Sequence, residues 1–368
     1  AYFSFHLDEP LSYGWAVSRE AFVMRSLPGR AWFEEKAGRF QSSVAEERGG
    51  AEALGAELYE ALFASLPARV LAKPRWILAL DGPLFDVPYA ALVTTRLAGR
   101  PRYLIEDHAL RIVPSAHSLS EKPGVCLNGE FVAIGDPVYN TADPRWRAAQ
   151  SQQSAWRFGV SPLLFAGRRA AGGMELPRLP GSAREIESCA RAWQAGQGAA
   201  LLLEGEEACR KNLLDALKRR PAVVHFATHF VPSAEQSRQA LLVLSLNAAG
   251  APDLVGPPEI SRWRFEVGLV TLSGCGSARG AKLPSEGLMG MTRAWLAAGA
   301  RTVVASLWPV PDGQGEIFTS FYRRLEGRAS SSGDAAEALR RAQLEALESR
   351  RGGEGRGHWA AYFVVGKD

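Results

Sequence analysis

A histidine and a cysteine each stand at the end of an apolar run, and together these residue types can perform nucleophilic chemistry. Residues 222–229 read AVVHFATH and end in His229, whereas residues 267–276 read VGLVTLSGCG and place Cys275 between two glycines. Apolar runs of this kind, rich in β-branched residues and stopped by glycine, indicate strands buried on both faces of a parallel sheet. Neighbouring strands of that sheet would bring the imidazole and the thiol to one edge, where open α/β sheets bind ligands. An imidazole beside a thiol favours the reactive thiolate.

The order and the spacing of this pair narrow the chemistry further. His229 precedes Cys275 by 46 residues. This interval is close to the value of about 50 that is typical of caspases, and the order is opposite to that of papain-like enzymes. The working hypothesis is therefore a caspase-like cysteine protease.

Several short motifs along the chain support a family resemblance. They are SYGW at 12–15, DGPL at 81–84, VPYAAL at 87–92, VPSA at 113–116, GDP at 135–137, HFATH at 225–229, LSGC at 272–275, EGL at 286–288, GA at 299–300, SLWPV at 306–310 and WAAYFVVG at 359–366. In this order they resemble the CHAT family, caspase-like peptidases often attached to tetratricopeptide repeats. The resemblance covers nearly the whole chain, and many motifs in sequence make it far more specific than any one of them.

The resemblance implies a fold and a division of the chain. The expected class is α/β: a caspase-like three-layer αβα sandwich with a mostly parallel sheet, preceded by a smaller α/β subdomain. We expect residues 1–120 to form that smaller, pseudo-protease-like unit and residues 121–368 to form the catalytic unit. The polar, turn-rich stretch 117–124 places the boundary. Alternating strand and helix patterns independently favour a parallel sheet covered on both faces.

The resemblance also assigns roles to the residues of the dyad. Cys275 would attack a peptide carbonyl to give a thioester, and His229 would act as base and then as acid toward the leaving amine. The backbone N–H groups of Phe230 and Cys275 would bind the oxyanion. Family members usually carry glycine at the position of Phe230, so this departure bears on the oxyanion geometry. His225 is the competing imidazole, but it lies about 13 Å back along the strand, where a hydrogen-bonded core histidine is expected.

Three further residues are candidates for substrate binding. Asp136 ends the first strand of the presumed catalytic unit, and the corresponding position in caspase relatives contributes to the S1 pocket. With Glu286 it would favour a basic P1 residue through a charge-assisted bidentate contact. The alternative for Asp136 is a turn residue before Pro137. Trp308 follows a buried strand and is expected either as a wall of the substrate groove or as core.

The composition excludes several other classes of protein. The chain has 368 residues, with 43 basic against 39 acidic side chains, a balance that does not indicate nucleic-acid binding. No apolar stretch reaches transmembrane length, and the start has no signal-peptide layout. Four cysteines without a CxxC pair favour reduced thiols and a cytoplasmic location. No cluster has metal-ligand spacing, and the glycines at 274–280 do not fit a dinucleotide loop, so neither metal nor cofactor is expected.

The remaining patterns predict individual elements around the dyad. Residues 2–7 and 12–18 are expected to form a hairpin, and 30–66 two helices separated at Gly49-Gly50. Ser182 with Glu185 predicts a capping box at the start of a helix over 183–194. Helices are also expected over 207–219, 287–298, 314–326 and 334–349, and strands over 75–80, 131–135, 301–307 and 362–365. Residues 140–181 lack periodicity and are expected to form a long surface excursion.

Two functions remain open at this level. The first is a cysteine endopeptidase that cleaves protein or peptide substrates and is regulated by a partner or a tetratricopeptide-repeat region outside this chain. The second is a caspase-like module with a weak or inactive site that serves as a protein-interaction scaffold, as the substitution at Phe230 suggests. The missing initiator Met suggests either an excised domain or a trimmed tag.

Overall fold

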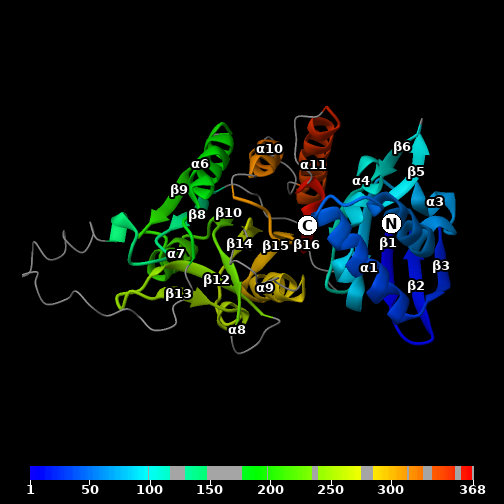
Figure 1. Cartoon of the computed structure of the whole chain (residues 1–368), viewed down its shortest axis with the longest axis horizontal. Coiled ribbons are helices and arrows are strands. Elements are labelled where there is room, and N and C mark those ends of the chain that lie inside the picture. Colours follow the sequence, from blue (N-terminus) through cyan, green and yellow to red (C-terminus); the bar gives the residue numbers. More distant parts are fainter. Residues whose placement is uncertain are drawn as a thin grey trace, which may run out of the picture.

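The computed structural model describes most of the chain in a single α/β architecture (Figure 1). The described residues are 1–97, 99–116, 129–146, 176–196, 198–233, 239–274, 285–312, 315–325, 334–352 and 358–366, with only the backbone described for 285–288. The expected α/β class is confirmed: one large, mostly parallel sheet has helices packed on it.

The central feature is an eleven-stranded sheet in the order β3-β2-β1-β4-β7-β16-β15-β14-β10-β8-β9. Neighbouring strands run antiparallel at β3–β2, β2–β1 and β16–β15, and the other neighbouring strands of this sheet run parallel. The strand bounds are β1 Tyr2–His6, β2 Leu11–Val17, β3 Phe22–Pro28, β4 Arg75–Ala79, β7 Ala109–Ile112, β8 Phe131–Pro137, β9 Ala200–Gly205, β10 Val223–Ala227, β14 Val267–Leu272, β15 Ala300–Ser306 and β16 Tyr362–Gly366.

The two expected units occupy contiguous halves of this sheet. Strands from residues 1–116 form one half, strands from 129–366 form the other, and the parallel pair Val365–Ile112 of β16 and β7 joins them. One hydrophobic cluster runs through both halves, from Phe3 and Phe63 to Tyr322 and Tyr362. The halves therefore share a sheet and a core, while the domain division itself stays a prediction because 117–128 lie outside the described residues.

Helices cover both faces of the C-terminal half (Figure 1). On one face α6 (Pro180–Gln194), α10 (Glu316–Leu325) and α11 (Ala335–Arg351) pack side by side, and on the other lie α7 (Arg210–Lys218), α8 (Pro257–Ile260) and α9 (Ser285–Ala298). The residues of β10 alternate between the two faces: Val223 and Ala227 pack with the first group, Val224 and Phe226 with the second. This alternation requires the continuous apolar run that the sequence shows.

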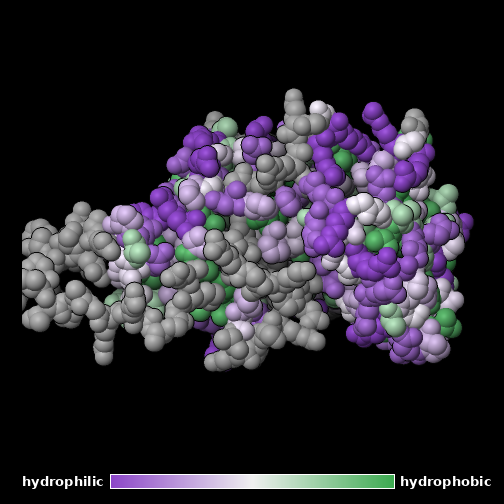
Figure 2. All heavy atoms as spheres, viewed as in Figure 1, coloured by the Kyte–Doolittle hydropathy of each residue, from purple (hydrophilic) through white to green (hydrophobic). Residues whose placement is uncertain are grey.

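The N-terminal half carries α1 (Arg30–Ala45), α2 (Ala51–Tyr59), the π-helix η1 (Glu60–Ala64) and α3 (Ala68–Leu71). The 3-10 turns Gly82–Asp86 and Tyr89–Ala91, the strands β5 (Val93–Leu97) and β6 (Arg100–Tyr103) and the helix α4 (Leu104–Asp107) complete this half, and the 3-10 turn His358–Ala361 precedes β16. The visible face of this half is mostly hydrophilic, and its hydrophobic residues form small separate patches (Figure 2). The expected hairpin and the two helices divided at Gly49-Gly50 are confirmed, and β3 is an additional strand.

A small antiparallel sheet, β11-β12-β13, follows the histidine strand and was not predicted. It comprises β11 (Phe230–Pro232), β12 (Ala240–Leu246) and β13 (Pro252–Val255). β12 packs against α9, and Val231 and Val243 join a cluster with Tyr139, Leu176 and Leu179 at the edge of the main sheet. This sheet therefore walls one side of the region where the site residues lie.

Candidate active site

The histidine strand and the cysteine strand are neighbours, as the sequence predicts. β10 and β14 pair in parallel, with His225 opposite Thr271 and Phe226 opposite Leu272, and the N–H of Ser273 donates to the carbonyl of Phe226 at 2.8 Å. Both strands end at the same edge of the sheet, with His229 beyond the end of β10. Cys275 itself lies outside the described residues.

A side-chain contact joins the tips of these two strands. A Cβ atom added to Gly274 would lie only 1.8 Å from a ring carbon of Phe230, so the ring packs directly over the bare α-carbon. Phe230 is the residue after His229, and Gly274 is the residue before Cys275. The two positions therefore form a matched pair, because a large ring at 230 requires the absence of a side chain at 274.

The backbone of Phe230 does not need the conformational freedom of glycine. Among the described residues other than glycine, positive φ occurs at Glu47, Asp136 and Arg220. Phe230 instead begins the regular strand β11 and pairs with Leu242, with its side chain 1% exposed. Replacement of the glycine thus introduces no left-handed strain here, while the oxyanion role of this N–H stays a prediction.

His229 is held by backbone and aromatic groups. Its Nε2 lies 2.8 Å from the carbonyl oxygen of Pro177, its backbone N–H donates to the Tyr139 hydroxyl at 3.3 Å, and the two rings lie 4.6 Å apart. A carbonyl oxygen can only accept, so Nε2 carries the hydrogen. In the neutral ring Nδ1 is then the basic nitrogen, which is the condition for accepting a thiol proton. The residue is 0% exposed.

His225 has a different environment, in the interior of the sheet. Its Nε2 lies 2.9 Å from Glu185 Oε1 on α6, its Nδ1 lies 2.8 Å from the Tyr322 hydroxyl on α10, and that hydroxyl donates to Thr271. Side chains therefore occupy both ring nitrogens. The expectation of a hydrogen-bonded core histidine is confirmed. The expected capping box is wrong, because Glu185 binds His225 and the helix already begins at Pro180.

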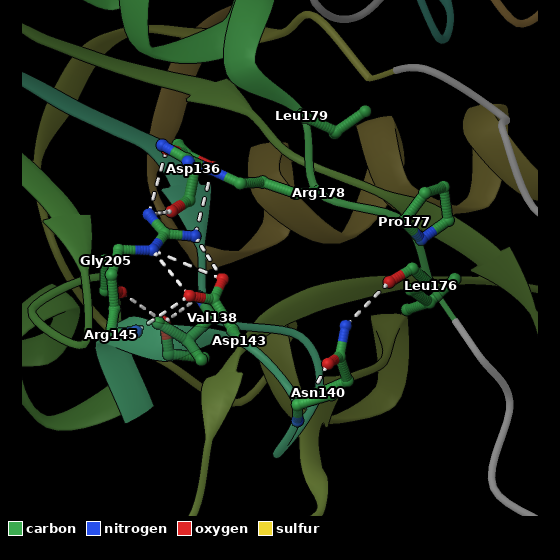
Figure 3. Close-up of polar contacts among 12 residues, drawn as sticks. Asp136, Val138, Asn140, Asp143, Arg145, Leu176, Pro177, Arg178, Leu179 and Gly205 are labelled. Carbon is green, nitrogen blue, oxygen red and sulfur yellow. Dashed lines mark hydrogen bonds and ion pairs between the residues drawn. The ribbon is translucent and has the colours of Figure 1, made fainter. Parts of the chain in front are cut away.

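Asp136 ends β8 at the same edge of the sheet (Figure 3). Gly135 pairs with Ala227, and Asp136 follows with a φ of 44°, a left-handed conformation that is uncommon outside glycine. The side chain is buried, and the backbone N–H donates to Ser182 Oγ at 2.9 Å. Asp136 is thus more than a turn residue before Pro137, since its carboxylate forms ion pairs with two arginine side chains.

Two arginines bind the Asp136 carboxylate from opposite sides (Figure 3). Arg145 approaches with Nη1 at 2.9 Å and also binds Asp143, while Arg178 approaches with Nη2 at 2.6 Å and Nε at 3.0 Å. The hydrogen bond to Asp136 raises the pKa of Arg178, and the hydrogen bond from Arg145 lowers the pKa of Asp143. Nothing in the sequence marks this pairing, because Arg145 and Arg178 lie 9 and 42 residues after Asp136 in a stretch without periodicity.

A third carboxylate lies near this cluster. Burial raises the pKa of Glu204 at the end of β9, and the negative charges of Glu187 and Asp136 add to the effect. An acidic surrounding of this kind would favour a cationic group over an anionic one.

The other predicted site residues have less to offer a substrate. Trp308 is 6% exposed and packs in the main core, with Nε1 donating to His358 at 3.4 Å, which favours the core alternative. Glu286 lies in the first turn of α9, and its side chain is outside the described residues. Asp312 accepts a hydrogen bond at 2.7 Å from the N–H of Gly181 in α6.

Comparison with known proteins identifies the family to which this chain belongs. The CHAT domain family model matches residues 52–367. The chain belongs to the CHAT domain family, which confirms the resemblance seen in the sequence. Tetratricopeptide repeat protein 28 is 24% identical both in mouse, over 338 residues, and in human, over 333 residues. In each comparison 79% of this chain is covered, but only 12% of the relative, so the chain spans a small part of these proteins.

Solved structures of the Saccharomyces cerevisiae separase–securin complex are also similar to this chain. Two of them cover 80% of it, and 15% and 16% of the matched chain, at 15% and 13% sequence identity with TM-scores of 0.39 and 0.41. Among the helices of the described residues, none is both long enough and apolar enough to cross a membrane.

Proposed function

We propose that this chain is a cysteine endopeptidase that cleaves polypeptides through a His229–Cys275 dyad. The observation that carries the proposal is the contact between the Phe230 ring and Gly274, because these residues are the immediate neighbours of the two dyad members. The register adds support: each paired residue of β10 faces the β14 residue 46 positions later, the same interval that separates His229 from Cys275.

The proposed reaction uses the tautomer that Pro177 imposes. With Nε2–H donating to the Pro177 carbonyl, Nδ1 of His229 takes the thiol proton, and the Cys275 sulfur attacks the peptide carbonyl. The N–H groups of Phe230 and Cys275 stabilise the oxyanion. The imidazolium then protonates the leaving amine, which gives a thioester, and water activated by the same imidazole releases the acid product.

The proposed substrate carries a basic residue at P1. Asp136, with Glu286 as a second expected carboxylate, would bind that side chain, and arginine fits best because its planar fork matches a carboxylate. Because the chain belongs to the CHAT family and its relatives are tetratricopeptide repeat proteins, we propose that a tetratricopeptide-repeat segment or another protein outside this chain regulates the peptidase. The proposed location of the cleavage is the cytoplasm.

A broad peptide library tests the proposal. Wild type and Cys275→Ala would be incubated with the library, and the products would be identified by mass spectrometry. We expect cleavages, enriched after arginine and lysine, that are lost in Cys275→Ala. Identical product sets from the two proteins would overturn the proposed activity.

One observation favours a second candidate, a scaffold with a closed or inactive site. His229 and Phe230 are both essentially unexposed, so the imidazole is sealed in the described state. Iodoacetamide separates the two functions, since a competent dyad makes Cys275 the fastest of the four thiols to react, whereas a scaffold would show no preference for it.

A further inference from the structure

The Arg178 side chain has the properties of an occupant rather than of a permanent part of the fold. Its guanidinium binds Asp136 through both Nε and Nη2, in the bidentate manner by which arginine binds carboxylates. The Asp136 side chain is 3% exposed, whereas the Arg178 side chain is 53% exposed. The contact thus joins a buried anion to a cation that enters from the solvent side.

The charges in direct contact balance only while Arg178 is present. Asp136 and Asp143 contribute two carboxylates, and Arg145 and Arg178 contribute two guanidinium groups. Arg145 is shared between both carboxylates, so it cannot neutralise Asp136 alone. Removal of Arg178 would leave one uncompensated negative charge in a nearly buried position, which is strongly unfavourable. The Asp136 carboxylate would then be able to bind one other guanidinium group in the place of Arg178.

The backbone that carries Arg178 is fixed on both sides. Leu176 and Leu179 are 1% and 3% exposed and pack with Tyr139, Val231 and Val243. The Asn140 side chain donates to the Leu176 carbonyl at 3.4 Å, and His229 donates to the Pro177 carbonyl. The Arg178 side chain can therefore leave Asp136 by rotation about its own bonds, without disturbing the Pro177 carbonyl that orients His229.

From these contacts we infer that Arg178 is an internal plug: it occupies the Asp136 subsite in the resting protein, and the arginine side chain of a substrate replaces it one for one. The inference rests on the proposed function, because it takes Asp136 as part of the substrate cleft. Exchange of one bidentate guanidinium for another keeps the charge balance. A neutral P1 side chain gains nothing from this exchange and leaves Arg178 in place.

The plug acts on substrate affinity and not on the chemical step. The apparent affinity for an arginine substrate falls by the fraction of molecules in which the subsite is open. Arg178→Ala is therefore expected to lower KM for peptides with arginine at P1 by about 10-fold or more, with kcat nearly unchanged. Peptides with norleucine at P1 should show no gain. Arg178→Lys, which keeps the charge but loses the fork, should lie between wild type and Arg178→Ala.

Direct binding of a small guanidinium compound separates the plug from catalysis. Agmatine would be titrated by calorimetry into wild type, Arg178→Ala and Arg178→Lys, each carrying Cys275→Ala to prevent turnover. We expect the Arg178→Ala/Cys275→Ala protein to bind agmatine at least 10-fold more tightly than the Cys275→Ala parent, in which Arg178 still occupies the subsite. Arg96→Ala is the matched control, since Arg96 is 54% exposed and pairs with Glu52 far from the subsite.

Each outcome has a distinct meaning. Tighter agmatine binding without peptide cleavage by any protein supports the plug and overturns the proposed activity. Peptide cleavage by wild type, with agmatine affinity and KM unchanged in Arg178→Ala, overturns the plug alone. A gain of the same size in Arg96→Ala also overturns it. If Arg178→Ala does not fold, Arg178→Lys decides the question, and agmatine affinity equal to that of the parent counts against the plug.

Discussion

His225 and His229 lie four residues apart on one segment and are both fully buried, yet the protein surrounds them with different chemistry. The interior histidine has a carboxylate at one ring nitrogen and a phenol hydroxyl at the other. The histidine at the rim of the sheet has a backbone carbonyl at Nε2. A carbonyl fixes the tautomer without adding a charge, as the proposed proton transfer at the rim requires, whereas the paired side chains of the interior stabilise the fold.

The largest expected effect comes from placing the same substitution at each of the two histidines and comparing the rates of peptide cleavage. His229→Gln should reduce kcat/KM by about 10³-fold or more, because loss of a dyad member removes the general base and acid. The same substitution at His225 should leave kcat per folded molecule within a few fold of wild type. Equal losses of activity at both positions would show that the rim and the interior are not functionally distinct.

A substitution at His225 should lower the free energy of unfolding more than one at His229. His225→Phe leaves Glu185 and the Tyr322 hydroxyl buried without their shared partner, which costs about 3 kcal/mol. Urea denaturation followed by circular dichroism would measure the loss. His229→Gln is the paired control and should cost clearly less, since a glutamine amide can still donate toward the Pro177 carbonyl. A larger loss at His229 than at His225 would contradict the assignment.

The contact between Phe230 and Gly274 offers a third test, confined to the rim. Gly274→Ala forces a methyl group into the buried Phe230 ring, and displacement of the adjacent strand tip by about 1 Å should reduce cleavage about 10²-fold. The double variant Phe230→Ala/Gly274→Ala should recover most of the loss. Gly290→Ala on α9, where an added Cβ meets nothing within 4 Å, should behave as wild type. Strictly additive effects of the two changes would show that the residues are not coupled.

The smallest effect is expected where α6 meets the rim. Asp312→Ala removes the carboxylate that accepts the Gly181 N–H. This N–H lies in the first turn of α6 and has no acceptor within the helix, so the change should lower the free energy of unfolding by about 1 kcal/mol. Because α6 follows directly after the Pro177 segment, a fall in cleavage of a few fold should accompany the change. The pair formed by His225 and Glu185, one turn further into the helix, should be unaffected, and a shift in its histidine resonances would argue otherwise.

The fold and part of the site could be predicted from the sequence because strands buried on both faces leave an unmistakable apolar pattern. The runs ending near His229 and Cys275 placed these two strands and their common edge, and the interior position of His225 followed from the strand rise. The start of α6 could also have been predicted, because proline is common in the first turn of a helix and α6 begins at Pro180. The Ser182–Glu185 pattern instead favours a start two or three residues later.

The contacts that sequence could not supply are those made by backbone atoms and by distant partners. The Pro177 carbonyl orients His229 through a group that every residue carries, so no residue type marks it. The pairing of Asp136 with Arg145 and Arg178 depends on tertiary packing of a stretch without periodicity. The small sheet β11-β12-β13 is marked in the sequence only at its central strand, through the apolar residues 240–246.

The central claim, contact between the His229 imidazole and the Cys275 sulfur, is tested most directly by the pH dependence of Cys275 alkylation. Iodoacetamide rates would be measured by mass spectrometry for wild type and His229→Gln, with Cys189 as an internal reference, because burial raises the pKa of its thiol and should keep it unreactive. Near pH 6.5 we expect Cys275 to react at least about 10-fold faster in wild type than in His229→Gln, with the variant following an ordinary thiol pKa of about 8.5. Superimposable profiles for the two proteins would contradict the central claim.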